Sequence, residues 1–112
     1  MSDRDFAHFK NMYKFAGRVE NRISDVSLET FLADEYLQDS ILYAIGHIGE
    51  SANEISEETK AHYHSILWNA LIGIRNRVFH SYEDVDMSIV YKAAKEHTPV
   101  LIEQLQRILG HD

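Results

Sequence analysis

Cysteine is absent from the 112 residues, and proline and glycine are scarce. Without thiols the chain has no disulfide, no thiolate metal ligand and no cysteine nucleophile. With one proline, Pro99, and five glycines, few residues interrupt helices, and the apolar residues recur at helical spacing. No apolar run reaches the roughly eighteen residues that cross a bilayer, and the charged N-terminus does not resemble a signal peptide. We therefore expect an all-α, soluble, cytoplasmic protein that needs no cofactor and contacts no membrane.

Basic residues are outnumbered, and the net charge of −7 argues against broad nucleic-acid binding. The charges are segregated along the chain, because residues 24–59 contain nine acidic side chains and no Lys or Arg. Residues 60–82 have the opposite bias, with Lys60, Arg75 and Arg77 and no carboxylate. This distribution favours a local anion site over a continuous electrostatic track.

Helical periodicity divides the chain into four main helices and a short one. We expect these segments at Asp3 to Ile23, Leu28 to Ala33, Asp34 to Ile55, Ser65 to Phe79 or His80, and from Asp86 to Leu109. Ser27, Ser65 and Asp86 are N-cap candidates, and the segment 56–59 should interrupt the pattern. Pro99 should kink the last helix, because it cannot donate a hydrogen bond to the Lys95 carbonyl. The sequence predicts a single domain, residues 1–112, folded as an up-down helical bundle.

Two apolar stripes define the faces of the longer helices. The first helix has Phe6, Phe9, Tyr13, Ala16, Val19 and Ile23. The long central helix has Leu37, Ile41, Ala44, Ile48, Ala52 and Ile55. The near-heptad spacing of the second stripe suits either antiparallel bundle packing or a dimer seam. Gly46 and Gly49 lie in the same helix, where close approach of another helix would explain them.

The segment from Arg75 to Tyr82, Arg-Asn-Arg-Val-Phe-His-Ser-Tyr, lies inside the carboxylate-free block. On a helical wheel Asn76 and His80 share a face, whereas Arg75 points about 140° away from His80. The two groups therefore do not meet well on one ideal helix. A second copy placed across a two-fold axis would supply the missing half of the site, so this geometry favours a homodimer.

These side chains suit metal-independent cleavage of RNA. Arg75 offers a planar fork of donors to phosphate oxygens, and Arg77 is a further candidate for binding RNA phosphate. His80 can move a proton near neutral pH, and Asn76 can orient the substrate or the imidazole. The simpler interpretation is an exposed polar helix end followed by a packed tyrosine, Tyr82.

Other polar residues suggest weaker candidate sites. His62 and His64 could bind a metal ion, although they are better interpreted as surface histidines without a nearby carboxylate. Glu50 and Glu54 form an i, i+4 pair, more typical of an exposed acidic face than of a metal site. Trp68 is interpreted as a core residue rather than as a platform for stacking bases.

The motif Arg75-x-x-x-x-His80-x-Tyr82 resembles the signature of the HEPN superfamily, and specifically of its HepT toxin branch. The segments 44–52, 66–68 and 82–86 are similar to HepT sequences, as is the proline within the last helix. The resemblance implies a HEPN-like helical homodimer with its site in the cleft between protomers. It also implies an endoribonuclease toxin of a type II/VII-like toxin–antitoxin pair, with tRNA as a reported substrate class.

The resemblance assigns roles to individual residues. Arg75 and His80 match the catalytic pair, and Asn76 matches the usual polar neighbour. Tyr82 matches the tyrosine that a cognate minimal nucleotidyltransferase antitoxin, MntA, modifies with AMP. A second class of function stays open from the residues, namely a non-catalytic helical module that binds a nucleotidyltransferase or a nucleotide.

Overall fold

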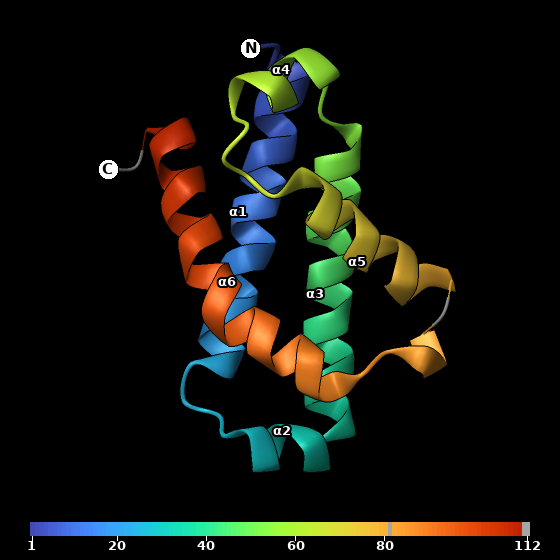
Figure 1. Cartoon of the computed structure of the whole chain (residues 1–112). Helices are drawn as coiled ribbons and strands as arrows, with labels where there is room; N and C mark the ends of the chain where they lie inside the picture. Colours follow the sequence, from blue (N-terminus) through green and yellow to red (C-terminus); the bar gives the residue numbers. More distant parts are fainter. Residues whose placement is uncertain (81, 111–112) are drawn as a thin grey trace.

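Helices make up all the regular structure in the part of the chain that the computed structural model describes, residues 1–80 and 82–110. They are α1 (Asp3–Ile23), α2 (Leu28–Ala33), α3 (Glu35–Glu54), α4 (Glu57–His62), α5 (Trp68–His80), the 3-10 helix η1 (Tyr82–Asp84) and α6 (Met87–Leu109). In Figure 1, α1 and α3 lie side by side, with α6 against α1 and α5 against α3. The predicted all-α bundle with four long helices is confirmed. No helix in these two ranges is long and apolar enough to cross a membrane.

Side-chain caps determine where several helices begin. Ser27 accepts a hydrogen bond from the Thr30 amide, and Asp86 accepts one from the Ser88 amide, as predicted for both caps. The predicted interruption at 56–59 is wrong in part, because Ser56 caps a further short helix, α4.

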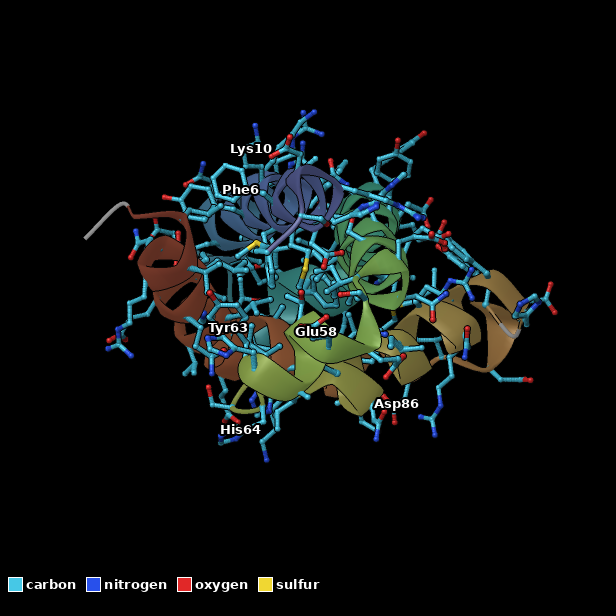
Figure 2. The ribbon with its side chains drawn as sticks, turned by 90° about the horizontal axis from the view of Figure 1, so that it is seen from above. Phe6, Lys10, Glu58, Tyr63, His64 and Asp86 are labelled. Carbon is cyan, nitrogen blue, oxygen red and sulfur yellow. The ribbon has the colours of Figure 1, made fainter. Side chains whose placement is uncertain are left out.

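The first turn of α1 is tied to α4 through Asp5, which is 3% exposed. Its carboxylate accepts hydrogen bonds from the Ser56 amide and hydroxyl and from the Thr59 hydroxyl. The Ser56 hydroxyl bond, helped by the one from Thr59, lowers the pKa of Asp5 although burial acts in the opposite direction. Because Asp5 points inward, the next residue, Phe6, does not join the core, and the prediction that it would is wrong. Phe6 lies on the outer side of α1 beside Lys10 (Figure 2).

The motif helix begins three residues later than predicted, at Trp68 rather than at Ser65. The Trp68 indole donates hydrogen bonds to the carbonyls of Lys60 and Tyr63, and this fastens the preceding turn to the end of α4. The Ser65 carbonyl accepts a hydrogen bond from the Gln104 side chain of α6. Trp68 is buried in the core, as predicted.

The apolar stripe of α3 is used inside the chain. Its buried members are Ile41, Ala44, Ile48, Ala52 and Ile55, and Leu37 packs partly buried against the same core. Of the two predicted uses, bundle packing is therefore the one observed, and this stripe is not free to form a dimer seam. Pro99 lies inside α6, which bends midway along its length (Figure 1), as expected for an internal proline.

Candidate functional site

Glycine allows α5 to approach α3 closely enough to place Arg75. A Cβ atom added at Gly49 would lie 2.3 Å from the Arg75 Cβ and 2.6 Å from the Leu71 carbonyl oxygen. A Cβ atom added at Gly46 would lie 3.1 Å from the Phe79 ring. The sequence-based expectation of a close helix contact at these two glycines is confirmed.

The guanidinium of Arg75 is held on three sides. Its Nε donates to a carboxylate oxygen of Glu50 at 2.6 Å, and its Nη1 donates to the Asn76 side-chain oxygen at 2.7 Å. The Phe79 ring lies beneath it, with its centroid 5.4 Å from the Arg75 Cζ. Contacts of this kind fix the plane of the guanidinium, and Nη2 has no hydrogen-bond partner among residues 1–80 and 82–110. A fixed, partly exposed guanidinium with a free edge can bind a phosphate oxygen.

His80 is the last residue of α5, and its side chain is exposed. No hydrogen bond or ion pair joins it to Arg75, and its imidazole makes none with any other described residue. Arg77 is also exposed and lines a hollow of about 420 Å³ together with Asp84 and Asp86. Ser81, the next member of the motif, lies outside the described residues. Arg75 and His80 are thus placed on one helix without being brought together.

Tyr82 begins η1, is 42% exposed, and donates a hydrogen bond from its phenol to the carboxylate of Asp39 in α3. That bond is the main cause that raises the pKa of Tyr82 to about 12, and burial and the charges of Asp39 and Glu35 act in the same direction. The phenol is therefore kept protonated and oriented towards α3.

One face of α3 links the two halves of the motif. Asp39 and Glu50 are eleven residues apart, which brings them back to nearly the same side of a helix after three turns. Asp39 bonds to Tyr82 and Glu50 bonds to Arg75. Sequence reasoning missed Asp39 entirely, although its spacing from Glu50 was a visible signal. It interpreted Glu50 mainly as part of an exposed acidic face.

The remaining candidates have other partners or surroundings. Glu54 forms an ion pair with Arg4 at 2.9 Å, so Glu50 and Glu54 have separate partners. His62 ends α4 with its ring 4.7 Å from that of Tyr63, and His64 is exposed on the opposite side of the molecule from Lys10 (Figure 2). In the described ranges, no three His, Asp or Glu side chains are grouped closely enough to hold a metal ion.

A mostly apolar groove of about 390 Å³ separates α5 from α6. Ile45 and Ile48 of α3 line it, together with Leu71 of α5 and Leu101 of α6. Leu67 and Val100, which also line it, are both exposed. The groove therefore exposes apolar surface beside the motif helix.

Comparison with known proteins places the chain in a family. The family profile described as "Ribonuclease HepT-like" matches residues 12–108. A Thermococcus cleftensis protein named "Probable ribonuclease HepT" is 27% identical over 90 residues, covering 80% of this chain and 82% of that protein. A Methanocaldococcus jannaschii protein named as a putative RNase is 23% identical over 107 residues, covering 95% of this chain and 98% of that protein. No solved structure gives a significant match. The chain therefore belongs to the HepT-like ribonuclease family.

Proposed function

We propose that this protein is a metal-independent endoribonuclease that uses Arg75, Asn76 and His80. The observation that carries the proposal is the fixed guanidinium of Arg75, whose Nε lies 2.6 Å from a carboxylate oxygen of Glu50. The exposed His80 lies on the same helix as Arg75, α5. Membership in a family whose relatives are named as ribonucleases supports the same activity.

The proposed reaction is an internal transesterification. The His80 imidazole removes the proton of a ribose 2′-hydroxyl, and the resulting oxygen attacks the adjacent phosphorus. Arg75 stabilises the negative charge that develops on the phosphate oxygens. The bond from phosphorus to the 5′-oxygen breaks, and a second imidazolium gives this oxygen its proton. The products are a 2′,3′-cyclic phosphate and a 5′-hydroxyl, and DNA is not a substrate because it lacks the 2′-hydroxyl.

The second imidazole is proposed to come from another copy of the chain. Arg75 and His80 do not contact each other within one protomer, so a two-fold partner would complete the site in a shared cleft. The groove between α5 and α6 adds uncovered apolar surface beside the motif helix, and this surface would favour dimerisation. Sedimentation of a monomer at micromolar concentration would argue strongly against this arrangement.

We further propose that the ribonuclease is a toxin, with tRNA as a candidate substrate, and that a cognate nucleotidyltransferase of the MntA type neutralises it at Tyr82. In the modification, the phenol oxygen of Tyr82 attacks the α-phosphorus of ATP and releases pyrophosphate. The phenol proton passes to a base of the transferase. The added AMP contributes negative charge and bulk two residues from His80, which would repel and obstruct RNA. The exposure of the Tyr82 side chain is compatible with access by such an enzyme.

The alternative function is a non-catalytic module that binds a nucleotidyltransferase or a nucleotide. The absence of a hydrogen bond to His80 from any described residue of the same protomer favours this alternative. An RNA cleavage assay with chelator present separates the two functions, and it compares the wild type with His80→Ala. His64→Ala is a matched control, because His64 is also an exposed histidine.

We expect His80→Ala to lower the cleavage rate at least about a hundredfold, as is usual for loss of a general base, and His64→Ala to leave it unchanged. Cyclic phosphate ends and growth arrest should appear with the wild type and with His64→Ala, but not with His80→Ala. Equal cleavage or equal toxicity of His80→Ala would contradict the catalytic assignment.

The proposed modification has its own test. Incubation with the cognate transferase and ATP should add the mass of AMP to the wild type and to Tyr36→Phe, but not to Tyr82→Phe. Tyr36 is a suitable control because its side chain is 90% exposed. Undiminished labelling of Tyr82→Phe would reject Tyr82 as the site.

A further inference from the structure

Three rings from α1 and α3 form a cluster on the surface where these helices lie side by side (Figure 1). The His47 ring stacks on Phe15 at 4.6 Å with an interplanar angle of 10°, and the Tyr43 ring lies 4.5 Å from that of His47. Two cationic side chains lie close to the Phe15 ring. Arg18 Cζ is 4.9 Å and Lys14 Nζ is 5.4 Å from its centroid. We call these five residues the aromatic–cation cluster.

The cluster has a rigid base and an open top. Phe15 is buried, His47 is half-buried, and Tyr43 is 60% exposed. A tyrosine that is held against a packed histidine loses little further freedom when a ligand stacks on it. Large aromatic side chains usually contribute most when they are buried, so an exposed one supported in this way indicates a partner with a flat, apolar face.

The position of Tyr43 connects the cluster to the proposed active site. Tyr43 follows Asp39 by four residues and precedes Glu50 by seven, so all three share one side of α3. Asp39 holds Tyr82, and Glu50 holds Arg75. Along the helix axis Tyr43 therefore lies between the residues that hold the two ends of the motif, about 6 Å from Asp39 and about 10 Å from Glu50.

We propose that Tyr43 and His47 stack an unpaired base of the RNA substrate, while Arg18 and Lys14 contact the neighbouring phosphates. This inference rests on the proposed ribonuclease function and adds single-stranded RNA as the substrate class. Aromatic platforms with adjacent cations are how proteins bind single strands without strict sequence preference, because every base has a stacking face. Residues 1–23, with five basic and three acidic side chains, supply positive charge on this side of a chain whose net charge is −7.

Charge favours RNA over a protein partner for this surface. Lys14 and Arg18 lie in the same cluster as the exposed Tyr43 ring. Two carboxylates on this face of α3, those of Asp39 and Glu50, are already bonded to Tyr82 and Arg75. An apolar protein surface would gain nothing from Lys14 and Arg18, and it would have to desolvate them.

Binding of a short, unstructured, fluorescently labelled RNA by fluorescence anisotropy tests the inference. All variants are made in the His80→Ala background, so that the probe is not cleaved. Tyr43→Ala should weaken binding about tenfold, the middle of the range for loss of one stacked base, and Tyr43→Phe should retain affinity. Phe6→Ala is the matched control, because it removes another exposed ring beside a cation, Lys10, on the side of α1 opposite Phe15, and should change nothing. Arg18→Gln should weaken binding and reduce the slope of affinity against salt by about one ion.

The possible outcomes separate this inference from the proposed function. Equal RNA affinities of Tyr43→Ala and Phe6→Ala would overturn the stacking site, while RNA cleavage by the wild type would leave the ribonuclease function intact. Loss of dimer mass in sedimentation of Tyr43→Ala, with folding intact by circular dichroism, would assign the surface to a protein interface and also overturn it. Absence of any RNA binding would count against both proposals.

Discussion

Replacing Gly49 with alanine should destabilise the protein and displace Arg75 from its position. In the wild type, α3 and α5 approach so closely at Gly49 that an added methyl group would lie 2.3 Å from the Arg75 Cβ and 2.6 Å from the Leu71 carbonyl oxygen. Ordinary contacts between carbon atoms require about 3.5–4.0 Å, so the helices would have to separate by more than about 1 Å. Neither contact is the end of a flexible side chain, and rotation about a side-chain bond cannot relieve them.

The expected free energies can be compared directly. Forcing a methylene-sized group into a packed contact costs about 1–3 kcal/mol, and we expect about 3 kcal/mol here because backbone must move. Alanine returns about 1 kcal/mol through its higher helix propensity. The net loss in the free energy of unfolding should therefore be about 2 kcal/mol, equivalent to a fall in Tm of roughly 8 °C for a domain of this size.

Gly17 supplies a matched control, because it also lies within a long helix and an added Cβ would meet no atom within 4 Å. Gly17→Ala should raise the free energy of unfolding by about 1 kcal/mol and Tm by roughly 4 °C. Both variants would be measured by thermal and urea denaturation followed by circular dichroism. A Gly49→Ala protein as stable as Gly17→Ala would refute the close α3–α5 contact.

Three further predictions concern charged groups. Asp39→Asn should lower the pKa of Tyr82 from about 12 towards 10.0. The measurement is an ultraviolet titration of tyrosinate absorbance, with Tyr82→Phe as the reference that lacks this phenol. Because the pKa of Tyr82 is raised in the folded state, its hydrogen bond to Asp39 adds fully to the free energy of unfolding below pH 10.0. This contribution is lost as the pH rises towards 12, and Asp39→Asn should not show this loss. Asp5→Asn should cost about 2 kcal/mol at neutral pH. Since the folded pKa of Asp5 is lowered from 3.8, the difference from wild type should shrink in urea titrations as pH falls through the folded value, and a constant difference would contradict this. Glu50→Gln should lower the rate of RNA cleavage about tenfold, because Arg75 loses a charged hydrogen-bond acceptor. The helix content by circular dichroism should stay the same. An unchanged cleavage rate would contradict the positioning role of Glu50.

Local patterns explain which parts of the fold the sequence could predict. The bounds of α1 matched because its apolar spacing is regular, and the caps at Ser27 and Asp86 matched because capping is local to one turn. The α4 helix was missed because six residues are too few to show an apolar periodicity, and because Asp5, which holds it against α1, lies 51 residues away in sequence. The start of α5 was misplaced for a similar reason, since hydrogen bonds of the Trp68 indole fix the turn before it.

The sequence by itself determined the helical class, the motif from Arg75 to Tyr82 and the two glycines that suggested a close contact. Each of these follows from periodicity or from spacing within one helix, where neighbours along the chain are neighbours in space. Only the tertiary structure decided that Glu50 would hold Arg75, that Asp39 would hold Tyr82, and that Tyr43 would stack with His47 against Phe15 of α1. Those pairings depend on the rotation and separation of α3 and α5, which long-range packing sets and which no local pattern encodes.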